Sequence, residues 1–176
     1  MADFNKAFEN TMQHEDSTHV GKVTVDAGGR TRFGIAAKFH PDLAEEFFTR
    51  SAEEALEDAE QIEQRDYWDR MRLSEVENQN VANKLFDMEV NMGVHQASIY
   101  AQRVTNFLLE CQGGGDVRVA EDGMIGDKTL EQINMIDPVY MLQYLREFSA
   151  AHYRHIVAVN PAQAVNLEGW LRRAAA

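Results

Sequence analysis

The chain contains little cysteine and proline and has no long apolar run. Its single cysteine, Cys111, excludes a disulfide within the chain and a zinc cluster of thiolates. No stretch reaches the roughly 18 consecutive apolar residues of a membrane-spanning helix, so we expect no insertion into a membrane. Only three prolines interrupt long segments rich in Ala, Glu, Leu and Gln, and this composition favours helices.

Basic charge is scarce as well. The 17 Lys and Arg residues stand against 29 Asp and Glu residues, which gives a formal net charge of −12. No basic block is present to neutralise phosphates, so the sequence argues against nucleic acid as a partner. The segment 1–8 lacks the basic and apolar regions of a secretory signal peptide, so we expect synthesis in the cytoplasm.

What the sequence does contain predicts a mainly α (α+β) protein. Its 176 residues, of which 44% are hydrophobic, suffice for one monomeric domain over 1–176 with two lobes around a cleft. Apolar residues at helical spacing and capping signals predict several helices. These cover about 3–15, 43–48, 51–68, 94–110, 127–134 and 137–158, with another that starts at a Ser74–Glu77 capping box and ends at Gly93, and a short one near Trp170.

One β-hairpin is predicted directly after the first helix. Val20, Val23 and Val25 favour a strand, and the sequence Asp26-Ala-Gly-Gly favours a turn. An alternating pattern then resumes over 31–35. We expect this hairpin to be the only sheet and to form a small lobe of its own.

The hairpin places a carboxylate and a hydroxyl close in sequence to a carboxylate at a helix end. Glu15 continues the apolar stripe of the first helix, so burial and the helix dipole should raise its pKa. Asp26, in a glycine-rich turn, should stay ionised, and Thr31 adds a hydroxyl. Glycoside hydrolysis uses such a pair, one carboxyl as acid and one as base. Spacing alone leaves the ordinary alternatives open, a solvated helix-end Glu and a turn Asp.

The same residues fall in a pattern that resembles a known family. The residues from His14-Glu15 through Asp26-Ala-Gly-Gly-Arg-Thr31 to Gly34-Ile35 resemble the N-terminal signature of glycoside hydrolase family 108, which are phage and bacterial muramidases. The similarity continues through Tyr67-Trp68 and the block 85–93. The segments 122–130 and 169–173 resemble the family's peptidoglycan-binding-type C-terminal part.

The resemblance implies a phage-type lysozyme fold and a reaction. Residues 1–110 would hold the catalytic signature and core helices, and 111–176 the peptidoglycan-binding-type part of the same domain. The activity would be inverting hydrolysis of the β-1,4 bond between N-acetylmuramic acid and N-acetylglucosamine in peptidoglycan, without a cofactor. Glu15 matches the family's catalytic Glu, and Asp26 and Thr31 would hold the attacking water. The enzyme would reach the wall through a holin-made lesion or a secretion device.

The sequence also departs from the family pattern. Glu15 is followed by Asp16-Ser17 where the family has Gly-Gly, and Ala36 stands where Thr is common. Asp16 could raise the pKa of Glu15 by like-charge repulsion or change the substrate preference. The altered residues and the acidic charge support an alternative, a non-catalytic peptidoglycan-binding or regulatory protein on the same scaffold.

Other residues are weaker candidates for the site. Trp68 and Asn91 could contact substrate, Trp68 by stacking on a sugar ring, although packing in the core is the ordinary role of a Trp. Asp87 and Asn91 should connect the lobes by hydrogen bonds. His14 and His19 are five residues apart rather than the four of a zinc-protease helix, so we expect no metal.

Overall fold

The computed structural model describes residues 1–15, 20–43, 45–113 and 117–176, except 27 and 28. For His14, Glu15 and Asp26 the description covers the main chain only. The structure is predominantly helical with one small antiparallel sheet, so the predicted mainly α class is confirmed. Among the described residues, no helix is both long and apolar enough to cross a membrane.

The elements follow one another in the order that the sequence predicted. In chain order they are α1 (Phe4–Glu15), β1 (Thr24–Asp26), β2 (Gly29–Arg32), β3 (Ile35–Ala36), η1 (Glu45–Phe48), α2 (Ala52–Glu63), η2 (Gln64–Trp68), η3 (Leu73–Glu75), α3 (Gln79–Met92), α4 (Val94–Cys111), α5 (Asp127–Met135), α6 (Pro138–Val159), η4 (Pro161–Asn166) and α7 (Leu167–Ala175). Here η2 is a single π-helical turn that continues α2, and the other η elements are 3-10 turns.

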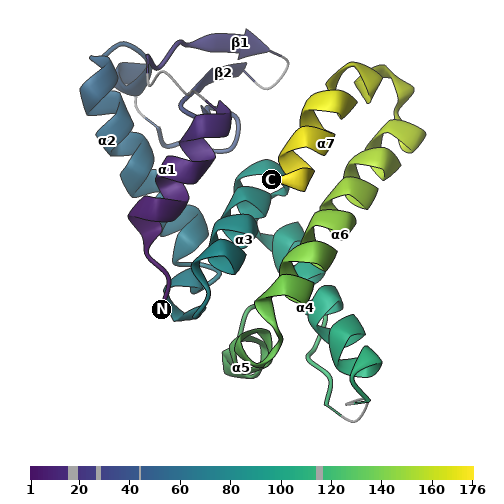
Figure 1. Cartoon of the computed structure of the whole chain (residues 1–176). Coiled ribbons are helices and arrows are strands. Elements are labelled where there is room, and N and C mark those ends of the chain that lie inside the picture. Colours follow the sequence, from purple (N-terminus) through teal and green to yellow (C-terminus); the bar gives the residue numbers. More distant parts are fainter. Residues whose placement is uncertain (16–19, 27–28, 44, 114–116) are drawn as a thin grey trace.

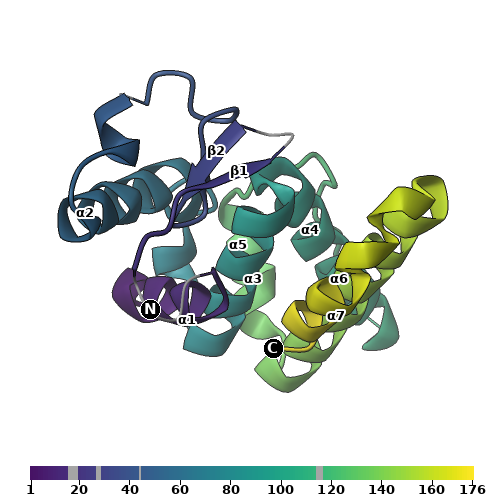
Figure 2. The same cartoon turned by 90° about the horizontal axis from the view of Figure 1, so that it is seen from above.

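Helix α3 forms the centre of the molecule. It packs against α1 on one side and against α4 and α6 on others. Figures 1 and 2 show α1, α2 and the sheet on one side of α3, with α6 and α7 on the opposite side. The core around α3 includes the rings of Phe4, Trp68 and Phe86, whose centroids lie 5.6–5.8 Å apart. Two lobes therefore share one hydrophobic core.

The sheet is larger than the predicted hairpin. Strand β2 pairs with β1 and also with β3, so three strands replace two. Phe33 and Gly34 both adopt positive φ angles (49° and 79°), and this reverses the chain between β2 and β3. The prediction of a single strand over 31–35 is therefore wrong, because a tight turn at Phe33 and Gly34 divides it. Phe33 gives no signal for this turn, since phenylalanine is uncommon in the left-handed conformation.

A buried arginine holds the sheet to the rest of its lobe. The Arg32 guanidinium donates hydrogen bonds to the carbonyls of Gly21, Phe47 and Arg50 at 2.8–2.9 Å. Gly21 has a φ of 61°, and a Cβ there would lie 2.3 Å from the Phe33 ring. Only glycine fits this position, and it brings the segment before β1 against the sheet.

The helix boundaries confirm some capping signals and correct one. Ser51 caps α2 in a capping box with Glu54, and Gly93 ends α3 with a φ of 84°. The predicted Ser74–Glu77 capping box is wrong. Asn78 is the N-cap of α3, with its side chain accepting from the amides of Asn80 and Val81. The Ser74 hydroxyl instead accepts a hydrogen bond from the Trp68 indole at 2.7 Å.

A buried ionic cluster connects α3 to the C-terminal helix. Asp87 accepts from Arg173 Nε at 2.6 Å and pairs with Lys84 Nζ at 3.4 Å. Lys84 also donates to the Arg173 carbonyl at 2.9 Å. The expected connecting role of Asp87 is thus confirmed, whereas the Asn91 amide bonds within its own helix, to the Asp87 carbonyl at 3.2 Å.

Candidate active-site cleft

The sheet lobe carries the three residues predicted to be catalytic. Glu15 is the last residue of α1, and Asp26 is the last residue of β1, where it pairs with Gly29. Thr31 is half-buried on β2 between Thr24 and Ala36. The side chains of Glu15 and Asp26, and all of Asp16 and Ser17, lie outside the described residues. Glu15 therefore precedes in sequence the two strands that bear the other two groups.

A pocket of about 800 Å³ lies where the lobes meet. It is lined by the segment after the sheet, by η2, by the α3–α4 junction and by α6. The lining residues that the argument uses are His40, Asp66, Tyr67, Arg70, Glu89 and Asn91. This volume lies within the range of about 300–1,000 Å³ that is usual for small-molecule binding sites.

Three titratable side chains, Tyr67, His40 and Asp66, lie in a row in its wall. The Tyr67 hydroxyl lies 3.3 Å from His40 Nε2, and His40 Nδ1 lies 3.6 Å from an Asp66 oxygen. Burial lowers the pKa of His40 despite the nearby Asp66 carboxylate, so the imidazole is neutral at pH 7. Asp66 favours the tautomer protonated on Nδ1, which leaves Nε2 to accept from the Tyr67 hydroxyl.

Tyr67 also remains neutral over the whole physiological range. Burial, followed by the negative charges of Glu63, Asp66 and Glu89, raises the pKa of Tyr67 to about 12. Its phenol is therefore a permanent hydrogen-bond donor and acceptor. His40 and Tyr67 therefore present neutral polar groups in a wall that also contains the Asp66 carboxylate and the Arg70 guanidinium.

A second pair of acids lies beneath this wall. Glu63 and Glu89 both have fully buried side chains, and neither oxygen of Glu89 has a hydrogen-bond partner among the described residues. Burial first, and then the neighbouring Glu63, raises the pKa of Glu89 well above its ordinary value, against the opposing charge of Arg70. Burial of Glu89 therefore favours its protonated, neutral form.

Neither acid was predicted to belong to the site. An acidic run such as 53–63 is usually a solvated helix face, and this holds for Glu53 and Glu57 but not for the buried Glu63. The available signal was spacing, because Glu63 lies four residues after the buried Ala59, and Glu89 four after the buried Leu85. A carboxylate on the apolar stripe of a helix could have been identified this way.

The two expected substrate contacts have different surroundings. Trp68 is fully buried between Phe4 and Phe86, so its ring offers no face on which a sugar could stack. We therefore assign Trp68 to the core. Asn91 is half-buried and lines the pocket. Its position suits a substrate contact, although its Nδ2 already donates to a backbone carbonyl.

Histidines and acids of the described segments do not assemble a metal site. No three His, Cys, Asp or Glu side chains of these segments gather closely enough to hold an ion. His152 lies 2.9 Å from the Tyr100 hydroxyl through Nδ1 instead. His19 belongs to the part of the chain that is not described.

The fold defines the class, a mainly helical protein with a small sheet and a lysozyme-like fold. The structure of Brucella abortus SagA is similar, with a TM-score of 0.67 at 18% identity, over 97% of this chain and 92% of that chain. Identity at this level shows the fold alone. No curated protein matches the sequence.

Two family models assign the particular family. Residues 8–93 match the model described as Glycosyl hydrolase 108, and residues 96–175 match the model described as Predicted Peptidoglycan domain. The chain therefore belongs to the glycosyl hydrolase 108 family and carries that peptidoglycan domain after it. The two matches meet at the junction between α3 and α4, in the wall of the 800 Å³ pocket.

Proposed function

We propose that this chain is a muramidase that hydrolyses the β-1,4 bond between N-acetylmuramic acid and N-acetylglucosamine. The observation that carries the proposal is the glycosyl hydrolase 108 match, which spans Glu15, Asp26 and Thr31 and is followed by a peptidoglycan domain. The pocket between the lobes supports it, because a glycan strand needs an open cleft. The two matched segments act as one unit, joined by the packing of α3 on α4 and α6.

Glu15 is the general acid of the proposed reaction and protonates the leaving glycosidic oxygen. It ends α1, where the helix dipole disfavours a negative charge and so favours the protonated form. Asp26 is the base that activates a water molecule, and the Thr31 hydroxyl orients that water. An inverting reaction requires about 6.5–9.5 Å between the two carboxyl groups, so that water fits between them.

The pocket wall binds the sugar in this proposal. Asn91, Tyr67 and His40 offer neutral donors and acceptors to the N-acetyl and hydroxyl groups of the substrate. No cofactor takes part in any step. The enzyme acts on the cell wall as a monomer, after release through a holin-made lesion or a secretion device.

Product analysis tests the bond that is cut. Purified Gram-negative peptidoglycan is digested, and the soluble fragments are reduced with borohydride and identified by mass spectrometry. We expect disaccharide muropeptides whose reduced end is N-acetylmuramic acid. Reduced N-acetylglucosamine ends would instead show a glucosaminidase. Binding to insoluble peptidoglycan without any release would show the non-catalytic alternative.

A further inference from the structure

The cleft between the lobes contains an exposed aromatic side chain that has no part in the reaction described above. Phe39 lies on the segment after the sheet and is 71% exposed, although it lines the 800 Å³ pocket. An aromatic ring for stacking on a sugar was expected at Trp68, which is fully buried. Single exposed apolar side chains are common on protein surfaces, so exposure alone assigns Phe39 no role.

The main chain fixes the position of Phe39 at the edge of the cleft. Its amide donates to the Ala36 carbonyl at 3.0 Å, in the turn that follows β3. The next residue, His40, is half-buried and contacts Tyr67 and Asp66 in the wall of the cleft. Phe39 is therefore held beside this polar row, with its ring exposed.

The ring of Phe39 has room for a ligand. Lys38 Nζ lies 5.5 Å from the ring centroid, and no aromatic ring of the described residues packs against Phe39. A sugar ring has an apolar C–H face and a polar rim, so an aromatic face flanked by hydrogen-bonding groups complements it. In this cleft those groups are His40, Tyr67 and Asn91.

A second pocket adjoins the cleft at Phe39. It has a volume of about 380 Å³, and Phe39, His40 and Asp66 line both pockets. The remaining lining residues of the second pocket are Pro41, Asp42, Leu43, Ile62 and Arg65. Phe39 thus lies where the two pockets meet, and together they accommodate a longer ligand than either pocket alone.

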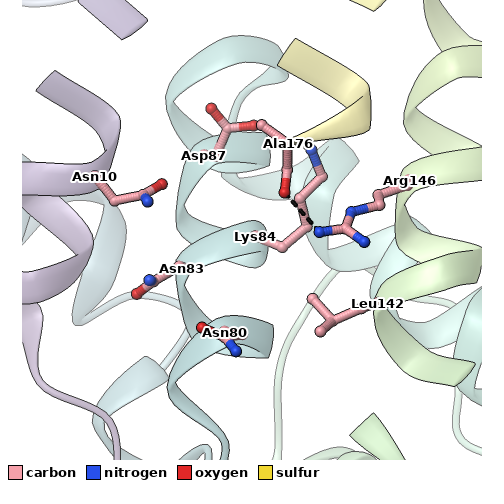
Figure 3. A pocket seen from close by; sticks show the side chains of 8 residues that line it. All are labelled: Asn10, Asn80, Asn83, Lys84, Asp87, Leu142, Arg146 and Ala176. Atoms are coloured by element: carbon pink, nitrogen blue, oxygen red, sulfur yellow. Dashed lines mark hydrogen bonds and ion pairs between the residues drawn. The ribbon is translucent and has the colours of Figure 1, made fainter. Parts of the chain in front are cut away.

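Two other hollows lack this combination. The pocket between α1, α3 and α6 in Figure 3 has a volume of only about 110 Å³, and in it Arg146 donates to the Ala176 carbonyl at 2.8 Å. Binding sites for small molecules usually exceed about 300 Å³. A groove of about 680 Å³ beside α6 and α7 has no aromatic side chain in its lining. Neither hollow therefore offers a sugar ring both sufficient space and an aromatic face.

We propose that Phe39 is a substrate-binding residue on which an N-acetylhexosamine ring of the glycan strand stacks, so that the strand extends from the 800 Å³ pocket into the adjoining 380 Å³ pocket. The identity of the glycan rests on the proposed function. The contact is apolar and involves no charge that develops during hydrolysis, so it stabilises substrate and transition state similarly. Loss of the ring should therefore raise KM and leave kcat nearly unchanged.

Calorimetric titration with a peptide-free tetrasaccharide of alternating N-acetylglucosamine and N-acetylmuramic acid tests the contact. All variants are made in a Glu15→Gln parent to limit hydrolysis. We expect Phe39→Ala to weaken binding about tenfold, because an apolar contact is lost. Phe39→Trp should retain the affinity of the parent, and Phe39→Leu, which is apolar but not aromatic, should not. Tyr140→Ala, an exposed aromatic on α6 outside both pockets, is the matched control and should bind like the parent.

Fluorescence and thermal unfolding distinguish stacking from a structural role. Saturation of Phe39→Trp with the tetrasaccharide should change the tryptophan emission in a way that the parent, which contains Trp68 and Trp170, does not show. The melting temperatures of the Phe39 variants should equal that of the parent, because the ring is exposed. Unchanged affinity in Phe39→Ala or Phe39→Leu, no change of emission, or no binding of the tetrasaccharide by the parent would overturn the proposal.

The role of Phe39 and the muramidase activity can be contradicted separately. A wild-type protein that binds the tetrasaccharide through Phe39 but releases no reducing ends from peptidoglycan would contradict the activity alone. Reducing-end release with the same KM in the wild type and in Phe39→Ala, in the natural Glu15 background, would contradict the role of Phe39 alone.

Discussion

Single residues of the pocket show how burial sets charge. Glu89 is fully buried with Glu63 close by, and the pKa of Glu89 is raised well above normal. A carboxyl whose pKa is raised on folding holds its proton more tightly in the folded state. Its contribution to the free energy of unfolding is therefore greatest at low pH, and it decreases as the pH rises from the unfolded pKa to the folded pKa.

Replacing Glu89 with Gln should remove its contribution to the pH dependence of the free energy of unfolding. We expect the melting temperatures of wild type and Glu89→Gln to be similar near pH 5, and the variant to become the more stable of the two by about pH 8. Glu57→Gln, an exposed acid on α2, is the matched control and should follow the wild type. A difference between wild type and Glu89→Gln that does not change with pH would show that Glu89 is ionised throughout.

A second prediction at the residue scale concerns the ionic cluster around Asp87. Asp87→Asn removes the buried carboxylate that pairs with Lys84 and Arg173, and should lower the free energy of unfolding by about 3–5 kcal/mol. Glu110→Gln breaks the exposed pair with Arg118 and should cost less than about 1 kcal/mol. Urea denaturation of the two variants compares them. Equal losses would mean that the cluster is not buried in solution.

At the scale of elements, substitutions of two glycines test the segment before β1 and helix α7. Gly21→Ala places a Cβ against the Phe33 ring at a φ of 61° and should destabilise the protein by about 1–3 kcal/mol. Gly169→Ala lies within α7 with open space around its Cβ and should stabilise it by about 0.5–1 kcal/mol. Thermal unfolding of the two variants measures whether each substitution lowers or raises the stability. If Gly21→Ala does not change the stability, the segment before β1 does not pack on the sheet in this way.

Most elements could be predicted because their signals are local. The stripe of α1, the capping box at Ser51 and the terminal Gly93 each depend on residues within one or two turns. The third strand could not, because the turn at Phe33 depends on how that ring packs against Gly21. The start of α3 was also missed, because Ser74 is occupied by the Trp68 indole and Asn78 caps the helix instead.

The candidate site likewise contains residues that the sequence could predict and residues that it could not. A family pattern in the sequence pointed to Glu15, Asp26 and Thr31, and these remain proposals. The row of Asp66, His40 and Tyr67 was not predicted, because His40 follows the sheet while the other two belong to η2. Only the tertiary fold places these side chains together.

The charge of the whole molecule predicts how activity responds to salt. With a net charge of −12, the protein should be repelled by peptidoglycan, which is largely anionic. Raising the ionic strength from about 0.01 M to about 0.15 M shortens the screening length from about 30 Å to about 8 Å. The initial rate of release from whole sacculi should therefore rise. A falling rate would show that a local positive surface, rather than net charge, governs binding.

The central claim is that Glu15 is the general acid of a muramidase. Its most direct test compares kcat/KM for reducing-end release by wild type, Glu15→Gln and Glu9→Gln, an exposed acid on the same helix, after equal folding is shown by circular dichroism. We expect Glu15→Gln to lose about 10²–10⁴-fold in rate, and Glu9→Gln to match the wild type. A folded Glu15→Gln variant that retains full activity would contradict the account.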